Sequence, residues 1–182
     1  MTTGMRWRIF VLQVGLIGIL GFVAGFAFWA SNFATSQVQT QLTAQKIDFP
    51  AANSAAIKAL PAADAAAMKV YAGQALTTGA QAETYANHFI AVHLQEIGGG
   101  QTYSQVSAAS IADPTNTKLS GEVQTLFRGE TLRGLLLNSY GWWQIGQYAF
   151  FAAIGLAIAA LVVFGAFVFE IVSWRRAVSE ER

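Results

Sequence analysis

Two long apolar stretches dominate the hydropathy pattern of the chain. One runs from Ile9 to Ala30 with Gln13 as its only clearly polar side chain, and the other runs from Ile145 to Trp174 with no charge before Glu170. A helix rises about 1.5 Å per residue, so roughly 20 apolar residues cross the apolar core of a bilayer. Each stretch is therefore predicted to be a membrane-spanning helix.

The first apolar stretch has a competing interpretation as a secretory signal peptide, because Arg6 and Arg8 precede it. It is longer than the roughly 7 to 15 residues typical of such a region, and no small-x-small cleavage pattern follows Trp29. We therefore expect a retained helix.

The segment between the two stretches has patterns typical of short helices. Residues 31–46 contain no breaker and extend the first helix until Pro50. Two Ala-rich helices, 51–60 and 62–73, are separated by Pro61, and we expect them to be the least well packed part of the chain because alanine buries little area. Residues 81–97 form an amphipathic helix with a broad apolar face, which a run of three glycines ends.

The last part of this segment is also predicted to be helical. A helix over 103–112 is followed by Asp113-Pro114, which resembles an N-cap and a first-turn proline. Apolar residues then recur every three or four positions over 118–140, almost into the second span. The fold class predicted is an all-α membrane protein, with two transmembrane helices flanking an extracytoplasmic helical domain.

Composition and charge agree with a membrane protein. Hydrophobic residues make up 54% of the chain and charged residues only 12%. The net charge of +1, without a basic run, gives no reason to expect nucleic acid as a partner. The absence of cysteine excludes disulfides, thiol chemistry and cysteine-ligated metal.

Basic residues beside the spans predict the topology. Arg6 and Arg8 precede the first span, Arg175 and Arg176 follow the second, and positive flanks tend to stay in the cytoplasm. The domains predicted are a cytoplasmic N-terminus, a first span, an extracytoplasmic domain, a second span and a cytoplasmic tail, at residues 1–8, 9–30, 31–141, 142–174 and 175–182.

Small residues line one side of each span and are candidates for helix packing: Gly18, Gly21, Gly25, Ala153 and Ala157. Small side chains let helix backbones approach closely in lipid. The functional interpretation is a close contact between the spans or with helices of another protein. The alternative is that glycine and alanine are simply common in membrane helices.

The two histidines, His88 and His93, are the main candidates for chemistry. They are five residues apart and point about 140° from each other on a regular helix, so they do not chelate one ion without a π-bulge or a further ligand such as Glu83, Glu96 or Asp113. His88 shares a face with Thr84 and Gln95 and is predicted to be exposed. No nucleophile, phosphate-loop or dinucleotide motif occurs, so we expect no catalytic, cofactor-binding or metal-binding residue.

A separate group of residues is a candidate ligand or interface site in the outer segment. The sequence GGGQTY forms either a backbone-lined concavity for an anion or another chain, or a flexible turn. The apolar faces of the outer helices would meet nearby. The candidates are Phe89, His93, Gly98, Gly99, Gly100, Tyr103 and Phe127.

Two longer motifs, HFIAVHLQEIGGGQTYSQVS and LFRGETLRGLLLNSYGWWQIG, lie between the spans. Together they resemble a group of small two-span actinobacterial membrane proteins of unknown function, some of which carry the label aromatic ring-opening dioxygenase. Non-haem iron enzymes of that kind use two histidines and a carboxylate on one face, which histidines pointing apart do not provide. The resemblance therefore implies the two-span architecture and no catalytic residue.

These observations favour a non-catalytic function. We expect an accessory or scaffolding subunit that packs in the bilayer against a larger membrane complex, for example a respiratory one, or against copies of itself. One alternative is an extracytoplasmic module that binds a small ligand or lipid, with a closed apolar pocket near Phe89, His93 and Phe127. The other is a metal-dependent enzyme that uses His88 and His93.

Overall fold

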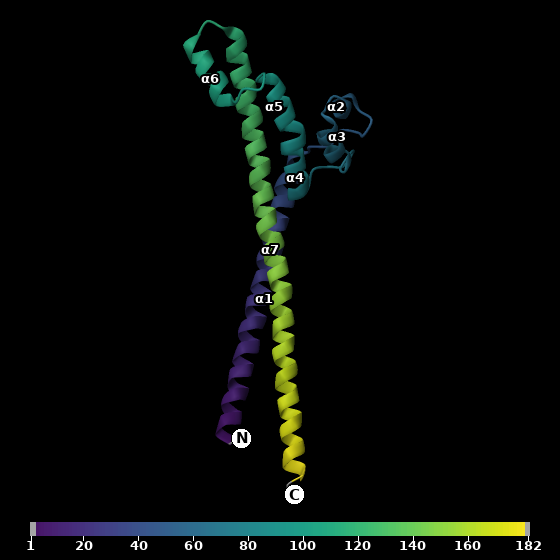
Figure 1. The fold of residues 1–182 in the computed structure, drawn as a ribbon, viewed down its shortest axis with the longest axis vertical. Coiled ribbons are helices and arrows are strands. Elements are labelled where there is room, and N and C mark those ends of the chain that lie inside the picture. Colours follow the sequence, from purple (N-terminus) through teal and green to yellow (C-terminus); the bar gives the residue numbers. More distant parts are fainter. Residues whose placement is uncertain (1–2, 181–182) are drawn as a thin grey trace. The chain divides into compact units, whose positions relative to one another are not determined.

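The computed structural model describes residues 3–180, and throughout them the regular structure is helical (Figure 1). A single isolated bridge pairs Asp48 with Ala75. The prediction of an all-α chain is confirmed for these residues. The elements are α1 Thr3–Gln45, α2 Ala55–Lys58, α3 Ala62–Lys69, α4 Gly79–Tyr85, the π-helical turn η1 Ala86–Ile90, α5 Ala91–Ile97, α6 Tyr103–Ala112 and α7 Thr117–Glu180.

The chain divides into two compact units, and the long helices α1 and α7 contribute to both. One unit combines the residues up to Phe33 with those from Ile145 onward, and we call it the span unit. The other is Ala34–Gln144, which we call the domain unit. Each unit has its own internal contacts, so each is described separately.

Both helices of the span unit are long and apolar enough to cross a membrane, which confirms the prediction of two such helices. The most apolar 18-residue stretches of α1 and α7 have mean hydropathies of 2.4 and 2.6. Only 6% of each stretch is buried in the protein. The core helix of a soluble protein would be mostly buried. The apolar side chains of α1 and α7 in this unit therefore face outward, where a lipid environment would accept them.

Aromatic and alanine side chains bring α1 and α7 together in the span unit. The ring of Phe10 lies 5.7 Å from that of Phe167, and Phe28 lies 6.4 Å from Phe150, measured between centroids. Ala24 and Ala153 are buried. Ring pairs at these separations contribute about 0.5 to 1.5 kcal/mol beyond the area that they bury.

The domain unit has one hydrophobic core, to which distant segments of the chain contribute. The N-terminal part of α7 provides Leu126 and Leu136, and the end of α1 provides Val38 and Leu42. The shorter helices and the loops between them contribute the remaining buried side chains, namely Phe49, Ile57, Leu60, Ala65, Met68, Leu76, Ala82, Ala86, Ile90, Leu94 and Val106.

The prediction that the Ala-rich segment is poorly packed is wrong. The helices α2 and α3 are shorter than predicted, yet Ile57 and Met68 within them are fully buried. Alanine lets these short helices lie close to the core, and each then inserts one large side chain. Backbone hydrogen bonds from Phe49 to Gln74 and from Leu76 to Ile47 fix the loop after α3 against the segment after α1.

The prediction that Asp113-Pro114 starts the last helix is also wrong. Asp113 follows the end of α6 in a non-helical conformation, and its carboxylate accepts hydrogen bonds from the side chains of Thr115 and Asn116. Asn116 instead caps α7, because its Oδ1 accepts the N–H of Leu119 at 3.2 Å. From Thr117 the helix runs without a break, so the predicted helix over 118–140 and the second span are one element.

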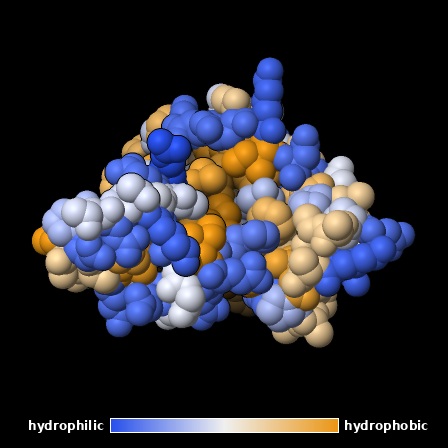
Figure 2. Space-filling model, turned by 90° about the horizontal axis from the view of Figure 1, so that it is seen from above, coloured by the Kyte–Doolittle hydropathy of each residue, from blue (hydrophilic) through white to orange (hydrophobic). Residues whose placement is uncertain are grey.

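Figure 2 shows the protein from above the view of Figure 1, so the surface near α6 faces the reader. Hydrophilic residues cover most of this face, and hydrophobic residues show between them. This differs from the apolar stretches of α1 and α7, where large apolar side chains are exposed.

Candidate functional site

A π-helical turn interrupts the helix that the sequence predicts over 81–97. In η1, the N–H of Ala91 donates to the carbonyl of Ala86, five residues earlier. The preceding helix α4 is fixed by a capping box, in which Gln81 and Thr78 exchange hydrogen bonds. Gln81 is only 6% exposed, and its Nε2 also donates to Gln74 at 3.1 Å. Single π-turns of this kind occur often at functional sites.

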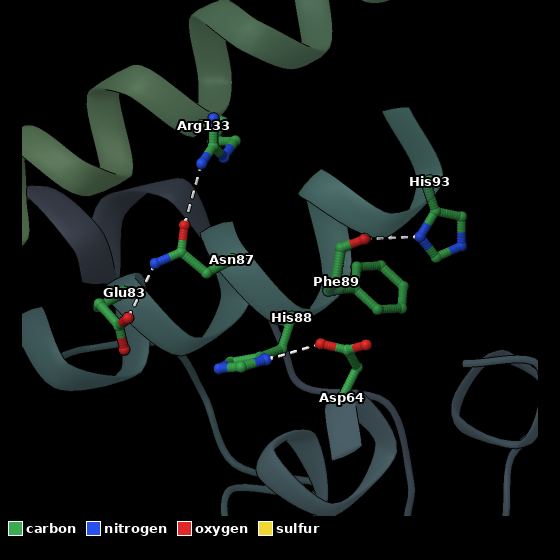
Figure 3. Close-up of polar contacts among 7 residues, drawn as sticks. All are labelled: Asp64, Glu83, Asn87, His88, Phe89, His93 and Arg133. Atoms are coloured by element: carbon green, nitrogen blue, oxygen red, sulfur yellow. Dashed lines mark hydrogen bonds and ion pairs between the residues drawn. The ribbon is translucent and has the colours of Figure 1, made fainter. Parts of the chain in front are cut away.

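His88 lies within the π-turn and contacts α3. Its Nδ1 is 2.8 Å from Oδ1 of Asp64, and the imidazole is 35% exposed (Figure 3). His88 is therefore partly exposed, with Asp64 as a partner that the sequence does not predict. The π-turn changes the direction of the side chain, and a carboxylate 24 positions earlier in the sequence meets it.

A chain of polar contacts links η1 to α7 on another side of the π-turn. Asn87 donates to Glu83 at 2.8 Å and accepts a hydrogen bond from Nη2 of Arg133 at 3.2 Å (Figure 3). Arg133 also lies 3.4 Å from Glu130. The guanidinium of Arg133 therefore joins α7 to η1 within the domain unit.

His93 pairs with the backbone one turn earlier. Its Nδ1 is 2.7 Å from the carbonyl oxygen of Phe89, and its ring lies 4.5 Å from the Phe89 ring between centroids. Because a carbonyl oxygen only accepts, Nδ1 carries the proton and donates. In the neutral imidazole, Nε2 is then left with a free lone pair.

The π-turn that a shared metal site would require is present, but it does not bring the histidines together. His88 faces Asp64, and His93 turns to the carbonyl of Phe89 (Figure 3). Within residues 3–180, no group of three or more His, Cys, Asp or Glu side chains is placed to hold a metal ion.

An open groove of about 400 Å³ lies between the segment 85–97 and α7. One wall is made by Tyr85, Phe89, Ile90, His93, Leu94 and Ile97. The α7 wall is made by Thr125, Arg128, Gly129 and Leu132. The two helices approach closely at Gly129, where an added Cβ would lie 2.3 Å from Cδ2 of Leu94. We call this feature the α5–α7 groove.

The structure brings together only part of the predicted ligand site. Phe89 and His93 line the groove, whereas Phe127 and Tyr103 contact each other at 5.9 Å between ring centroids and are not among its lining residues. In place of the expected closed pocket near Phe127, the structure has an open groove that Phe127 does not line. Arg128 and Gly129 also line the groove, although the sequence pattern does not predict them as site residues.

Tyr85 lies at one end of the groove, among other aromatic rings. It contacts Phe49 at 5.3 Å and Phe89 at 5.0 Å between centroids. Burial raises the pKa of the Tyr85 phenol above its ordinary value, because the charged form is poorly solvated there. The phenol is therefore neutral near pH 7 and keeps its hydrogen to donate.

The glycine run forms a turn rather than an anion-binding concavity. Gly99 and Gly100 have φ values of +57° and +82°, a conformation that favours glycine. The N–H groups of Gly98, Gly99 and Gly100 donate to carbonyls of Leu94, Glu96 and Gln95. A concavity for an anion needs free N–H groups, and these are already used.

The glycine face of α1 is not the contact between the two spans. Gly18, Gly21 and Gly25 are exposed, and a Cβ added at any of them would meet nothing within 4 Å. Of the two predicted positions on α7, Ala153 is buried and Ala157 is exposed. The spans meet through aromatic side chains and through Ala24 and Ala153, on another side of α1 than the glycines. The structure therefore contradicts contact between the spans at the glycines and Ala157, whereas the predicted position Ala153 is buried.

Comparison with known proteins gives no further identification. No protein-family model, curated protein or solved structure matches the chain.

Proposed function

We propose that the chain is a non-catalytic integral membrane protein that serves as an accessory or scaffolding subunit. The main support is the glycine face of α1, defined by Gly18, Gly21 and Gly25, which the second span leaves uncovered. Helices in lipid associate through close van der Waals packing, and small residues permit it. Another helix, from a larger membrane complex or from a second copy of the chain, would cover this face.

The proposed membrane location is supported by the outward-facing apolar side chains of the span unit. Leu12, Phe22, Leu161 and Phe169 are each more than two-thirds exposed. In water such a surface would promote aggregation, whereas in a bilayer it needs no cover. The basic flanks support cytoplasmic termini and an extracytoplasmic domain unit.

The topology is testable because the chain has no cysteine, so single-cysteine variants react at one position. We expect Lys58→Cys and Lys118→Cys, both at exposed positions of the domain unit, to react with a membrane-impermeant maleimide in intact cells. Ser179→Cys should react only after lysis. Labelling of Ser179→Cys alone in intact cells would show the inverted topology.

The assembly is tested by replacing two glycines with a bulky residue. We expect the wild-type chain in mild detergent to run well above its monomer mass of 19.5 kDa, alone or with co-purifying subunits, as measured by light scattering and mass spectrometry. The double variant Gly21→Leu/Gly25→Leu should run as a monomer, because leucine prevents close approach.

The matched control is Gly165→Leu, an equally open glycine on α7, which should leave the assembly intact. A monomeric wild-type chain, or an assembly that survives both α1 substitutions, would refute the proposed scaffold through this face.

A further inference from the structure

The α5–α7 groove is long and mostly apolar. Its lining residues cover about 18 Å along the 85–97 segment and about 10 Å along α7, at 1.5 Å per residue. Its walls combine aromatic rings with aliphatic side chains, and its volume of about 400 Å³ lies at the low end of the roughly 300 to 1,000 Å³ of small-molecule sites. A groove of this shape and volume suits a ligand with one hydrocarbon chain better than a ligand with two.

The groove is lined by positive charge and not by negative charge. Arg128 lines it, and none of the lining residues is acidic. The neighbouring carboxylates of α7 are engaged elsewhere, since Glu122 pairs with Lys118 and Glu130 pairs with Arg133. Within residues 3–180, no ion pair involves Arg128. The groove therefore favours an anion over a cation.

His93 provides a second polar group in the apolar wall. Its Nδ1 is committed to the carbonyl of Phe89, which fixes the ring, and no residue of the described part of the chain, 3–180, makes a hydrogen bond with Nε2. A protonated imidazole would donate from Nε2 to an oxygen anion, and a neutral one would accept from a hydroxyl. In either protonation state, the His93 imidazole can therefore bind an oxygen atom of a ligand head group that lies close to an apolar chain.

We propose that the α5–α7 groove binds a single-chain amphipathic carboxylate of the fatty-acid class. The carboxylate lies at the Arg128 guanidinium, whose planar fork matches two carboxylate oxygens. The acyl chain lies along Phe89 and Leu132. Binding of this kind needs no partner subunit, so its failure and the failure of the proposed assembly are separate results.

The test uses the full chain in phosphatidylcholine nanodiscs and a hexadecanoate probe that carries a photoreactive diazirine. We expect mass spectrometry to locate the cross-links within 85–97 and 125–132. Unlabelled hexadecanoate should compete, whereas hexadecanol, which has the same chain without the charge, should compete at least tenfold less well, in accord with the strength of charge-assisted hydrogen bonds.

Three variants distinguish charge from shape. Arg128→Gln should weaken competition by hexadecanoate about tenfold. Lys58→Gln removes the same charge from an exposed position of the domain unit that does not line the groove, and should have no effect. Leu132→Trp, at a partly exposed position, should fill the groove and abolish cross-linking there, with an unchanged circular dichroism spectrum as the check on folding.

Several outcomes would overturn the proposal. Cross-links restricted to the span unit would show that the probe only partitions into lipid. Equal effects of Arg128→Gln and Lys58→Gln would remove the assigned role of Arg128. Preferential cross-linking of a diacyl phosphatidylglycerol probe in the groove would identify a two-chain lipid instead.

Discussion

Replacing Ile57 with alanine should lower the free energy of unfolding of the domain unit by about 2 to 5 kcal/mol. Ile57 is 0% exposed and belongs to the hydrophobic core, although its helix α2 has only four residues. So short a helix has no stability of its own, and the isoleucine side chain is the main link between α2 and the core. Its removal leaves a cavity that the surrounding helices fill only in part.

The matched control is the same substitution at Ile111, which is 77% exposed in α6. Ile111→Ala should change the free energy of unfolding by no more than about 0.5 kcal/mol. Chemical unfolding of the full chain in detergent, followed by the near-ultraviolet circular dichroism of the domain aromatics, compares the two variants. Equal unfolding midpoints would show that the Ala-rich segment is not part of the core.

Replacing Gly79 with alanine should destabilise the domain unit by about 3 kcal/mol, at the upper end of the usual effects of overpacking. Gly79 is the first residue of α4, and an added Cβ would lie 2.2 Å from Cβ of Trp143 and 2.5 Å from its Cγ. Because Cβ of Trp143 is attached directly to the α7 backbone, rotation of the side chain does not relieve the clash. One of the two helices has to move.

Two other glycines of α7 serve as comparisons. At Gly134 an added Cβ meets nothing within 4 Å, so Gly134→Ala should raise the free energy of unfolding by up to about 1 kcal/mol through helix propensity. At Gly129 the clash is with the flexible end of the Leu94 side chain. The free energy of unfolding of Gly129→Ala should therefore lie between those of Gly79→Ala and Gly134→Ala. A Gly79→Ala protein as stable as Gly134→Ala would contradict the close approach of α4 and α7.

The sequence predicts the helices whose signals are local. The apolar stretches are long enough to cross a bilayer, and the segment over 103–112 has the helical pattern that the structure confirms. In contrast, the burial of Ile57 and Met68 depends on tertiary packing, such as that of α3 against η1, which is distant in the sequence and is not indicated by composition. Asp113-Pro114 suits a helix start or the turn after a helix equally well.

The candidate site could be predicted only in part, for a related reason. Phe89 and His93 are recognisable because they lie on the apolar face of an amphipathic helix. The π-turn has no clear sequence signal, yet it directs His88 toward Asp64. Arg128 and Gly129 are recognisable as part of a groove only once α7 lies opposite Leu94, and that pairing is a property of the tertiary structure.

The way in which the core of the domain unit is assembled sets the order of events during synthesis. Its first contributor, Val38, and its last, Leu136, are separated by nearly the whole unit. Contacts between such distant residues form slowly, because a long loop has to close first. The short helices between them are made early, with their apolar side chains uncovered. They have to avoid aggregation until the ribosome has produced α7 as far as Leu136, so a chaperone that holds unfolded chains is most useful in that interval.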